Sequence, residues 1–303
     1  SRMRYCLPGI VRLVRKIKPQ TILSTVPYLN AMSIVARLFL PASVRLLVRE
    51  AATPSAFIAE DTRYPRLWRF LYRRIYPHAD KVICLSDSMR QDFAENFFLP
   101  PENLVRIYNP VDGEMIQRLG RGAGNPYTSA GPNLVVAGRL RREKGIDLLL
   151  DAMRTVIQII PNARLTILGE GQDEARLKAQ AHRLGLNQNV DFLGFVQNPW
   201  VHVANADLFV LPSRAEGLPN SLLESLALGT PVLASDCVGA MRELQSMDPR
   251  IILFPAENPA AMADAIVSAL RNTKEAEAHN KPYSRQYDEF NPQRVAEQYS
   301  ALF

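Results

Sequence analysis

The chain has 303 residues, 47% of which are apolar, so length and composition allow two globular domains with sizeable cores. No apolar run approaches the ~20 residues that a helix needs to cross a bilayer. The three cysteines, Cys6, Cys84 and Cys237, lie too far apart for a disulfide framework, and we interpret them as buried thiols in a reducing compartment.

The net charge of +6 is unevenly distributed along the chain. Residues 1–110 hold 17 Lys and Arg against 8 Asp and Glu, whereas the remainder holds 19 against 22. A basic domain of this kind indicates an anionic partner. A membrane surface is favoured over nucleic acid, because no nucleic-acid-binding motif accompanies the basic residues.

Strand-like and helix-like segments alternate through the first 112 residues, a pattern typical of βα units around a parallel sheet. A basic helix is expected at 10–18. The predicted strands are 21–25, 44–48, 81–85 and 103–107, and the predicted helices between them are 30–39, 63–77 and 87–97.

The predicted helix at 63–77 mixes arginines with large aromatic residues. One interpretation is a surface that lies on an anionic membrane. The other is an ordinary amphipathic helix that packs Leu67, Phe70 and Leu71 inward and leaves its arginines in solvent.

A cluster of glycine and proline interrupts the alternation at 113–132, and we predict a linker there between domains 1–112 and 133–282. Beyond it the alternation resumes. The predicted strands are 133–137, 164–168, 190–193, 207–211, 231–234 and 250–254, and the predicted helices include 145–160, 173–184, 220–228 and 259–271.

Two cations follow the first strand of the second domain. That strand ends at Gly138, so Arg139 and Lys144 come in the loop before the next helix. Because ligands of such sheets bind beyond the carboxyl ends of the strands, both side chains are candidates to hold phosphate. The alternative is a pair of solvated surface cations.

A glycine turn, Gly169-Glu170-Gly171, follows the next strand. It falls short of the dinucleotide-binding fingerprint, because no third glycine stands at the required offset. Taken alone, a G-x-G turn is weak evidence for any ligand, and the alternative is a plain βα turn.

The most informative segment runs from Glu216 to Glu224, after a short buried strand. It places one carboxylate in a loop and a second about a turn into a helix. Pro219 suits the first helical turn, where its missing N–H costs nothing. The N–H groups of Asn220 and Ser221 then face the end of the strand, a geometry that binds phosphate. Carboxylates beside a phosphate site commonly hold hydroxyl groups. A ligand that has both phosphates and many hydroxyl groups is a nucleotide sugar.

The spacing of the two glutamates matches the E-x7-E pattern, and the chain resembles family 4 of the retaining GT-B glycosyltransferases. Further segments agree with that family in order and spacing over about residues 131 to 270: Val136–Leu140 with Lys144-Gly145, Leu168–Gly171 and Gly229–Ser235. The resemblance implies an α/β protein of the GT-B fold, with two Rossmann-like, doubly wound parallel-sheet domains facing a cleft. It also implies that the N-terminal domain is incomplete, and that residues 283–303 form a helical segment that returns to that domain.

The resemblance assigns the site residue by residue. Arg139 and Lys144 would stabilise the diphosphate leaving group, and Glu216 would face the transferred sugar, which makes these three the candidate catalytic residues. Glu224 would accept hydrogen bonds from the ribose hydroxyls. The other residues expected at the donor are Gly138, Gly169, Gly171, Phe195, Val196, Gly217, Leu218, Asn220 and Ser221. In the alternative interpretation of the two glutamates, Glu216 caps a helix dipole and Glu224 lies on a solvent-exposed helix face.

The reaction implied is transfer of a hexose or N-acetylhexosamine, with retention, from a nucleotide sugar to a lipid-linked or surface-glycan acceptor. UDP is favoured as the nucleotide and GDP is second. The enzyme is expected in the cytoplasm, peripheral on the inner face of the membrane. A non-catalytic nucleotide-sugar-binding or partner subunit and a GT-B sugar-nucleotide epimerase remain the alternatives.

No cofactor and no metal are expected. No D-x-D pair stands in a polar loop, and His78, His182, His202 and His279 form no cluster with Asp or Cys at ligand spacing. Family members often carry a histidine in the first domain near the donor. Here the corresponding strand end has none, and Arg49 or Glu50 is the candidate for that place.

Overall fold

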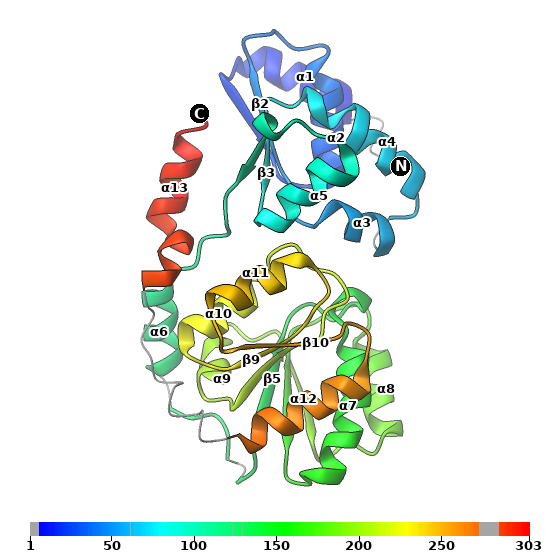
Figure 1. The fold of residues 1–303 in the computed structure, drawn as a ribbon, viewed down its shortest axis with the longest axis vertical. Coiled ribbons are helices and arrows are strands. Elements are labelled where there is room, and N and C mark those ends of the chain that lie inside the picture. The colour runs from blue at the N-terminus through cyan, green and yellow to red at the C-terminus, as the bar shows by residue number, and fades with distance from the viewer. Residues whose placement is uncertain (1–5, 61, 123, 129, 273–284) are drawn as a thin grey trace. The chain divides into compact units, whose positions relative to one another are not determined.

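The computed structural model describes residues 6–60, 62–122, 124–128, 130–272 and 285–303, and they fall into two compact units (Figure 1). Unit 1 contains the described residues up to Asn109, together with Glu216–Leu218 and Gln293–Phe303. Unit 2 contains the described residues of Pro110–Ala215 and Pro219–Pro292.

Unit 1 is built on a parallel sheet whose strands pair in sequence order, β1-β2-β3-β4. Its elements are α1 (Cys6–Ile17), β1 (Thr21–Ser24), α2 (Pro27–Arg37), β2 (Arg45–Arg49), α3 (Pro54–Glu60), α4 (Pro65–Arg74), β3 (Lys81–Cys84), α5 (Asp87–Phe97), β4 (Leu104–Arg106) and α13 (Pro292–Ser300).

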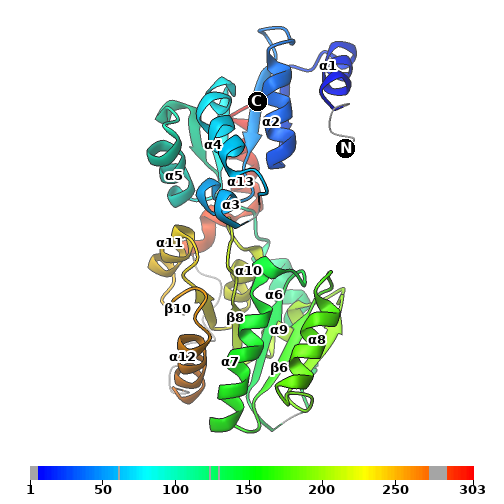
Figure 2. The same ribbon diagram turned by 90° about the vertical axis from the view of Figure 1, so that its right-hand side faces the viewer.

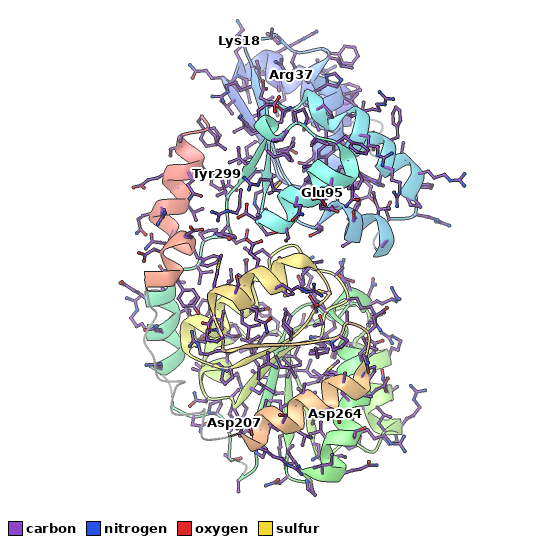
Figure 3. The ribbon with its side chains drawn as sticks, viewed as in Figure 1. Lys18, Arg37, Glu95, Asp207, Asp264 and Tyr299 are labelled. Carbon is purple, nitrogen blue, oxygen red and sulfur yellow. The ribbon has the colours of Figure 1, made fainter. Side chains whose placement is uncertain are left out.

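The C-terminal helix α13 covers one face of this sheet (Figure 2). Its Val295 packs against Leu47, Ile83 and Ile107. Tyr299, one turn further along and labelled in Figure 3, joins the same cluster. The strands of unit 1 therefore obtain part of their core from the end of the chain.

An aromatic cluster packs α4 against α3 and α5. Trp68 and Tyr72 are 2% and 0% exposed. The ring of Trp68 lies 4.9 Å from that of Phe57, and the ring of Tyr72 lies 5.5 Å from that of Phe93. These aromatics bury the largest surfaces of the helix and so fix its orientation.

The predicted inward face of α4 is therefore wrong. Leu67 and Phe70 are 52% and 56% exposed, beside the arginines of the same helix. Leu71 is half-buried. The arginines are exposed, as the same interpretation expected.

Unit 2 contains a six-stranded parallel sheet in the order β10-β9-β8-β5-β6-β7. Its elements are α6 (Gly113–Arg121), β5 (Asn133–Ala137), α7 (Ile146–Ile159), β6 (Arg164–Leu168), α8 (Glu174–Arg183), β7 (Val190–Gly194), α9 (Trp200–Ala204), β8 (Leu208–Leu211), α10 (Asn220–Leu228), β9 (Val232–Ser235), α11 (Gly239–Met247), β10 (Ile251–Phe254) and α12 (Pro259–Arg271).

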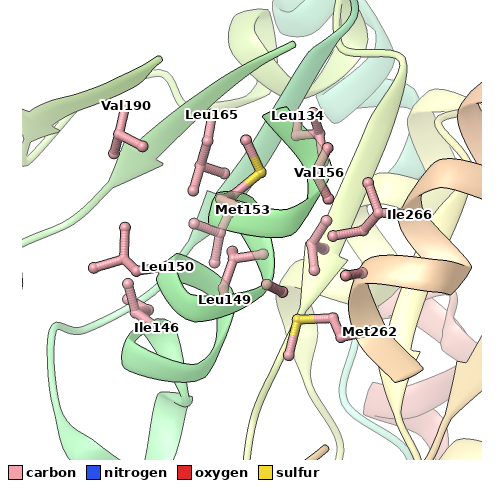
Figure 4. Packing of buried hydrophobic residues seen from close by; sticks show 14 of the residues in the cluster. Leu134, Ile146, Leu149, Leu150, Met153, Val156, Leu165, Val190, Met262 and Ile266 are labelled. Atoms are coloured by element: carbon pink, nitrogen blue, oxygen red, sulfur yellow. The ribbon is translucent and has the colours of Figure 1, made fainter. Parts of the chain in front are cut away.

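The core of unit 2 lies between its sheet and helices α7 and α12 (Figure 4). Apolar residues recur every three or four positions along α7, which turns one continuous face to the strands. The members of that face are Ile146, Leu149, Leu150, Met153 and Val156. Met262 and Ile266 of α12 belong to the same cluster.

Each predicted strand is observed to within one residue at either end. The predicted linker at 113–132 differs from the structure, because it begins with helix α6. The side chain of Asp112 caps this helix by accepting a hydrogen bond from the N–H of Met115, 2.9 Å away. Gly120 allows α6 to pack closely, since a Cβ would lie 2.6 Å from the side chain of Leu228 and 3.1 Å from the carbonyl oxygen of Trp200.

Within the described residues, none of the helices is long and apolar enough to span a bilayer. Cys84 is buried, as predicted, whereas Cys237 is only partly buried, because it lies in the loop after β9. The side chain of Cys6 lies outside the described part of the structure.

Candidate functional site

The strand order of unit 2 reverses between β5 and β8, which defines the topological switch point of the sheet. The loops that leave these two strands touch at Gly145. This residue has a φ of +64°, and a Cβ on it would lie 1.9 Å from the carbonyl oxygen of Pro212. Glycine therefore allows the start of α7 to approach the end of β8.

Arg214 holds the same two loops together. Its guanidinium donates two hydrogen bonds to the carboxylate of Asp147, at 2.8 and 3.0 Å, and one to the carbonyl of Arg142 at 2.7 Å. It also pairs with Glu257 at 2.9 Å, and its side chain is only 7% exposed. The loop that carries Lys144 is thus fixed against the loop after β8.

We call the contacts of Arg214 with Asp147, Arg142 and Glu257 the clasp. Within it, the charges of Arg214 and Asp147 stabilise each other. Burial raises the pKa of Asp147, but the hydrogen bonds and charge of Arg214 outweigh it, so the pKa of Asp147 lies below its usual value. The hydrogen bond to Asp147 likewise raises the pKa of Arg214. Both groups are therefore ionised at neutral pH.

The predicted glycine positions bring the loops after β5, β6 and β7 together. A Cβ on Gly169, whose φ is +130°, would lie 2.0 Å from the carbonyl oxygen of Gly138. A Cβ on Gly171 would lie 2.2 Å from the carbonyl oxygen of Leu140. The N–H of Gly169 also donates to the carbonyl of Gly194 at 2.7 Å. These glycines are thus needed for close backbone contact between the loops.

The two predicted cations, Arg139 and Lys144, lie between β5 and α7. The side chain of Lys144 lies over Gly138, since a Cβ at that glycine would be 3.7 Å from Lys144 Cδ. Arg139 follows directly and is exposed. Lys144 itself lies in a short 3-10 turn, Arg142–Lys144, just before α7.

On the side of β7, Phe195 is 75% exposed and Val196 is half-buried. The N–H of Phe195 donates to the carboxylate of Glu170 at 3.2 Å. Glu170 was treated only as the middle of a glycine turn in the sequence. Its role in holding the neighbouring loop depends on a contact 25 residues away.

Helix α10 begins at Asn220, as predicted, with Pro219 at the N-cap position rather than within the first turn. The first N–H groups of any helix have no acceptor within it, and the role expected for those of Asn220 and Ser221 at a phosphate stays a prediction. Glu224 is half-buried one turn later. The indole N–H of Trp200 donates to Glu224 Oε2 at 2.9 Å, a contact that the sequence did not reveal.

Glu216–Leu218 belong to unit 1 rather than unit 2. A Cβ on Gly217 would lie 2.2 Å from the carbonyl oxygen of Ala51, so the segment packs directly on the loop after β2. The side-chain amide of Asn109 donates to the carbonyl of Leu218 at 3.1 Å, and Arg49 donates to the oxygen of that same amide at 2.5 Å. Within unit 1, Arg49 and Asn109 thus support the segment that carries Glu216.

The other candidate for the place of the family histidine, Glu50, is fully buried. Tyr76 and Asn30 both donate to its Oε1, at 2.5 and 2.6 Å. Burial raises the pKa of Glu50 to about 7, although these hydrogen bonds lower it in part. Glu50 therefore supports the core at the end of β2 and is not exposed to a ligand.

The predicted site residues are divided between the two units. Arg139, Lys144 and Glu224 belong to unit 2 and Glu216 to unit 1. The meeting of these four side chains around one ligand stays a prediction.

No group of three or more His, Cys, Asp or Glu residues is arranged to bind a metal within the described part of the chain. His78 and His182 are exposed, and burial lowers the pKa of His202. His279 lies outside the described residues.

A cavity of about 620 Å³ lies at the opposite edge of the sheet, where the strands begin. It is lined by Pro132, Asp207 and Pro231, which precede β5, β8 and β9 (Asp207 is labelled in Figure 3). It is therefore separate from the loops described above.

The chain consists of two α/β units, each built on a parallel sheet. The GT-B glycosyltransferases belong to the class of proteins with this architecture. The chain itself belongs to the glycosyl transferases group 1 family, whose model matches residues 128–286. The model of Glycosyltransferase Family 4 matches residues 2–114. The chain is thus a member of a family of transferase enzymes.

Two relatives of this chain have names that refer to lipid-linked molecules. One is N-acetylgalactosamine-N,N'-diacetylbacillosaminyl-diphospho-undecaprenol 4-alpha-N-acetylgalactosaminyltransferase of Campylobacter jejuni, 28% identical over 88% of this chain and 71% of that protein. The other is phosphatidyl-myo-inositol mannosyltransferase of Mycobacterium leprae, 36% identical over 55% of this chain and 44% of that protein. The match to the second relative thus spans less than half of its length.

Solved structures share the fold. Anabaena HepE in complex with UDP has a TM-score of 0.77 and 21% identity, covering 98% of this chain and 81% of that one. Sucrose-phosphate synthase from Thermosynechococcus elongatus has a TM-score of 0.81 and 20% identity, covering 100% and 78%. The chain therefore has the GT-B fold that its sequence predicted.

Proposed function

We propose that this chain is a retaining glycosyltransferase that moves a hexose or N-acetylhexosamine from a nucleotide sugar to a lipid-linked or surface-glycan acceptor. The observation that carries the proposal is the edge of unit 2 at the β5–β8 switch point. There Gly138, Lys144 and Gly169 come from loops in mutual contact, and parallel sheets bind their ligands at this kind of edge.

Arg139 and Lys144 are proposed to neutralise the departing diphosphate. A cation within ~4 Å of a phosphate contributes about 4 kcal/mol at an effective dielectric near 20, more than the 0.3–1 kcal/mol of a helix terminus. The two side chains thus supply positive charge without a metal or cofactor. Glu216 is proposed to favour positive charge on the sugar ring, and the departing phosphate to accept the proton of the attacking hydroxyl.

The donor and acceptor are inferred from related proteins. The HepE structures contain UDP, and one contains UDP-glucose. The Campylobacter relative is named for an undecaprenol-linked acceptor and the mycobacterial relative for phosphatidylinositol. We therefore favour a UDP-sugar donor, with GDP second, and an acceptor carried on lipid.

An anionic membrane surface is the proposed partner of unit 1, which would locate the enzyme on the inner face of the membrane. Residues 1–49 contain no Asp or Glu. On α4, Leu67 and Phe70 are exposed among arginines, a combination suited to the boundary between lipid headgroups and acyl chains.

The experiment that tests the proposed activity is a panel of UDP- and GDP-sugars incubated with undecaprenyl-diphosphate glycans, with and without EDTA. Release of the nucleoside diphosphate and glycosylation of the lipid are measured, and NMR assigns the anomeric configuration of the product. Transfer with retention that survives EDTA supports the proposal. Binding without transfer would instead identify a non-catalytic subunit, and conversion of the sugar itself would identify an epimerase.

Two variants separate the roles of the site residues. Glu224→Ala should weaken UDP binding by roughly tenfold or more, because it removes hydrogen bonds to a charged group. Lys144→Ala should mainly lower kcat. The matched controls are Glu174→Ala and Lys178→Ala, whose side chains pair with each other on the surface of α8. If the site variants behave like these controls, the site assignment is wrong.

A further inference from the structure

We infer that Trp200 belongs to the donor site: its indole N–H holds one carboxylate oxygen of Glu224, so that the other oxygen faces the ribose hydroxyls of a nucleoside diphosphate. The inference rests on the proposed function and adds a residue to it. It starts from the 2.9 Å hydrogen bond between Trp200 Nε1 and Glu224 Oε2.

The backbone of Trp200 is fixed by helix α6. The carbonyl oxygen of Trp200 lies against Gly120, where a Cβ would approach it to 3.1 Å. Two residues earlier, the side-chain amide of Asn198 donates to the carbonyl of Leu119 at 3.0 Å. At the other end of α9, Thr230 donates to the carbonyl of Val203 at 2.7 Å. The indole is therefore presented by a short helix whose two ends are tied down.

Glu224 occupies the open face of α10. Its neighbours along the helix are buried from Leu222 to Leu228, whereas Asn220 is exposed and Ser221 is half-buried. Residues 220, 221 and 224 share one side of a helix. Glu224 thus lies on the same side of α10 as Asn220 and Ser221, whose N–H groups are proposed to bind the diphosphate.

The chemistry of the pair leaves room for a ligand. A carboxylate has about four acceptor sites, and the indole can donate only one proton. Trp200 therefore orients Glu224 without saturating it, and Oε1 remains to accept from a diol. Hydrogen bonds that a carboxylate accepts are among the stronger ones, so both the indole and a diol can contribute to holding Glu224 and the ligand.

The test compares UDP with 2′-deoxy-UDP by isothermal titration. The wild type should bind UDP more tightly by roughly tenfold. Glu224→Ala should bring the ratio of the two dissociation constants close to one. Trp200→Phe, which keeps an aromatic ring but removes the indole N–H, should lower the ratio several-fold, and it should have no added effect in the Glu224→Ala background.

The matched control is Trp68→Phe, the same substitution at a core position of unit 1, which should leave the ratio unchanged. If Trp200→Phe weakens both ligands equally, or neither, Trp200 is structural and the inference is wrong. If Glu224→Ala itself leaves the ratio unchanged, the proposed ribose site fails and the inference fails with it. Should the chain bind GDP rather than UDP, the same comparison uses GDP and 2′-deoxy-GDP, since the ribose is common to both.

A second measurement does not depend on substituting Trp200. The chain has two tryptophans, so Trp68→Phe leaves Trp200 as the sole indole emitter. Its fluorescence should change on titration with UDP, and the change should vanish in the Trp68→Phe/Glu224→Gln double variant. An emission that does not respond to saturating UDP would overturn the inference.

Discussion

Glu50 is a carboxyl group in the core of unit 1 whose pKa is raised to about 7 by burial. In the unfolded chain a glutamate has a pKa near 4.3. Folding therefore favours the protonated form. The stability that Glu50 contributes is fully present below about pH 4.3 and is lost as pH rises towards 7.

Replacement of Glu50 by Gln should remove this loss, because Gln keeps an acceptor for Tyr76 and Asn30 but does not ionise. We expect Glu50→Gln to stabilise unit 1 by roughly 2–3 kcal/mol at pH 8 and to have little effect at pH 4. Urea unfolding in a Trp200→Phe background, where Trp68 reports on unit 1, measures the difference. Glu95→Gln on the exposed face of α5 is the control, and equal pH profiles for the two variants would contradict the assignment.

Single residues also show which contacts can be predicted from the sequence. Gly169 and Gly171 could be placed at backbone contacts because strand ends and glycines are local signals. Trp200 and Arg214 could not be assigned partners, since Glu224 and Asp147 lie 24 and 67 residues away. Such contacts depend on which loops the sheet order brings together.

At the scale of elements, the clasp between the β5 and β8 loops depends on one arginine. Arg214→Met would leave Asp147 partly buried without the guanidinium that donates two hydrogen bonds to it, and we expect a loss of roughly 2–3 kcal/mol at pH 7. Because the pKa of Asp147 is lowered in the folded state, the stability from this pair is present above about pH 4 and is lost as pH falls through that lowered pKa. The difference between wild type and variant should therefore shrink in acid.

The control for this prediction is Arg176→Met. Arg176 also faces Asp147, at 4.0 Å, but its side chain is 50% exposed. Its substitution should change the free energy of unfolding by no more than about 0.5 kcal/mol. Similar losses for both variants in chemical denaturation would show that the clasp is not specific to Arg214.

Helices were predicted less completely than strands. The segment Gly113–Arg121 was interpreted as linker because of its glycines, yet Gly120 is there for close packing against α9 and α10. One of the two interpretations of α4 places Leu67, Phe70 and Leu71 inward, whereas the aromatic cluster buries Trp68 and Tyr72. Both differences arise from tertiary packing, which local periodicity does not contain.

At the scale of the whole molecule, positive charge is concentrated in residues 1–110. The chain should float with vesicles that contain phosphatidylglycerol and remain unbound with phosphatidylcholine alone. Leu67→Ser/Phe70→Ser should weaken the flotation several-fold, because it removes exposed apolar surface without altering charge. Ile159→Ser, an exposed position of unit 2, is the matched control. Equal recovery of the protein with both kinds of vesicle would contradict the membrane proposal.

The assignment of Glu216–Leu218 to unit 1 has a practical consequence for dissecting this protein. A fragment expressed from residue 110 to residue 292 would contain the whole six-stranded sheet, but the segment around Gly217 would lose Ala51 and Asn109, against which it packs. The first glutamate of the E-x7-E pair would then sit on an unsupported loop. Such a fragment would thus keep both glutamates in its sequence but would lose the contacts with unit 1 that hold the segment carrying Glu216.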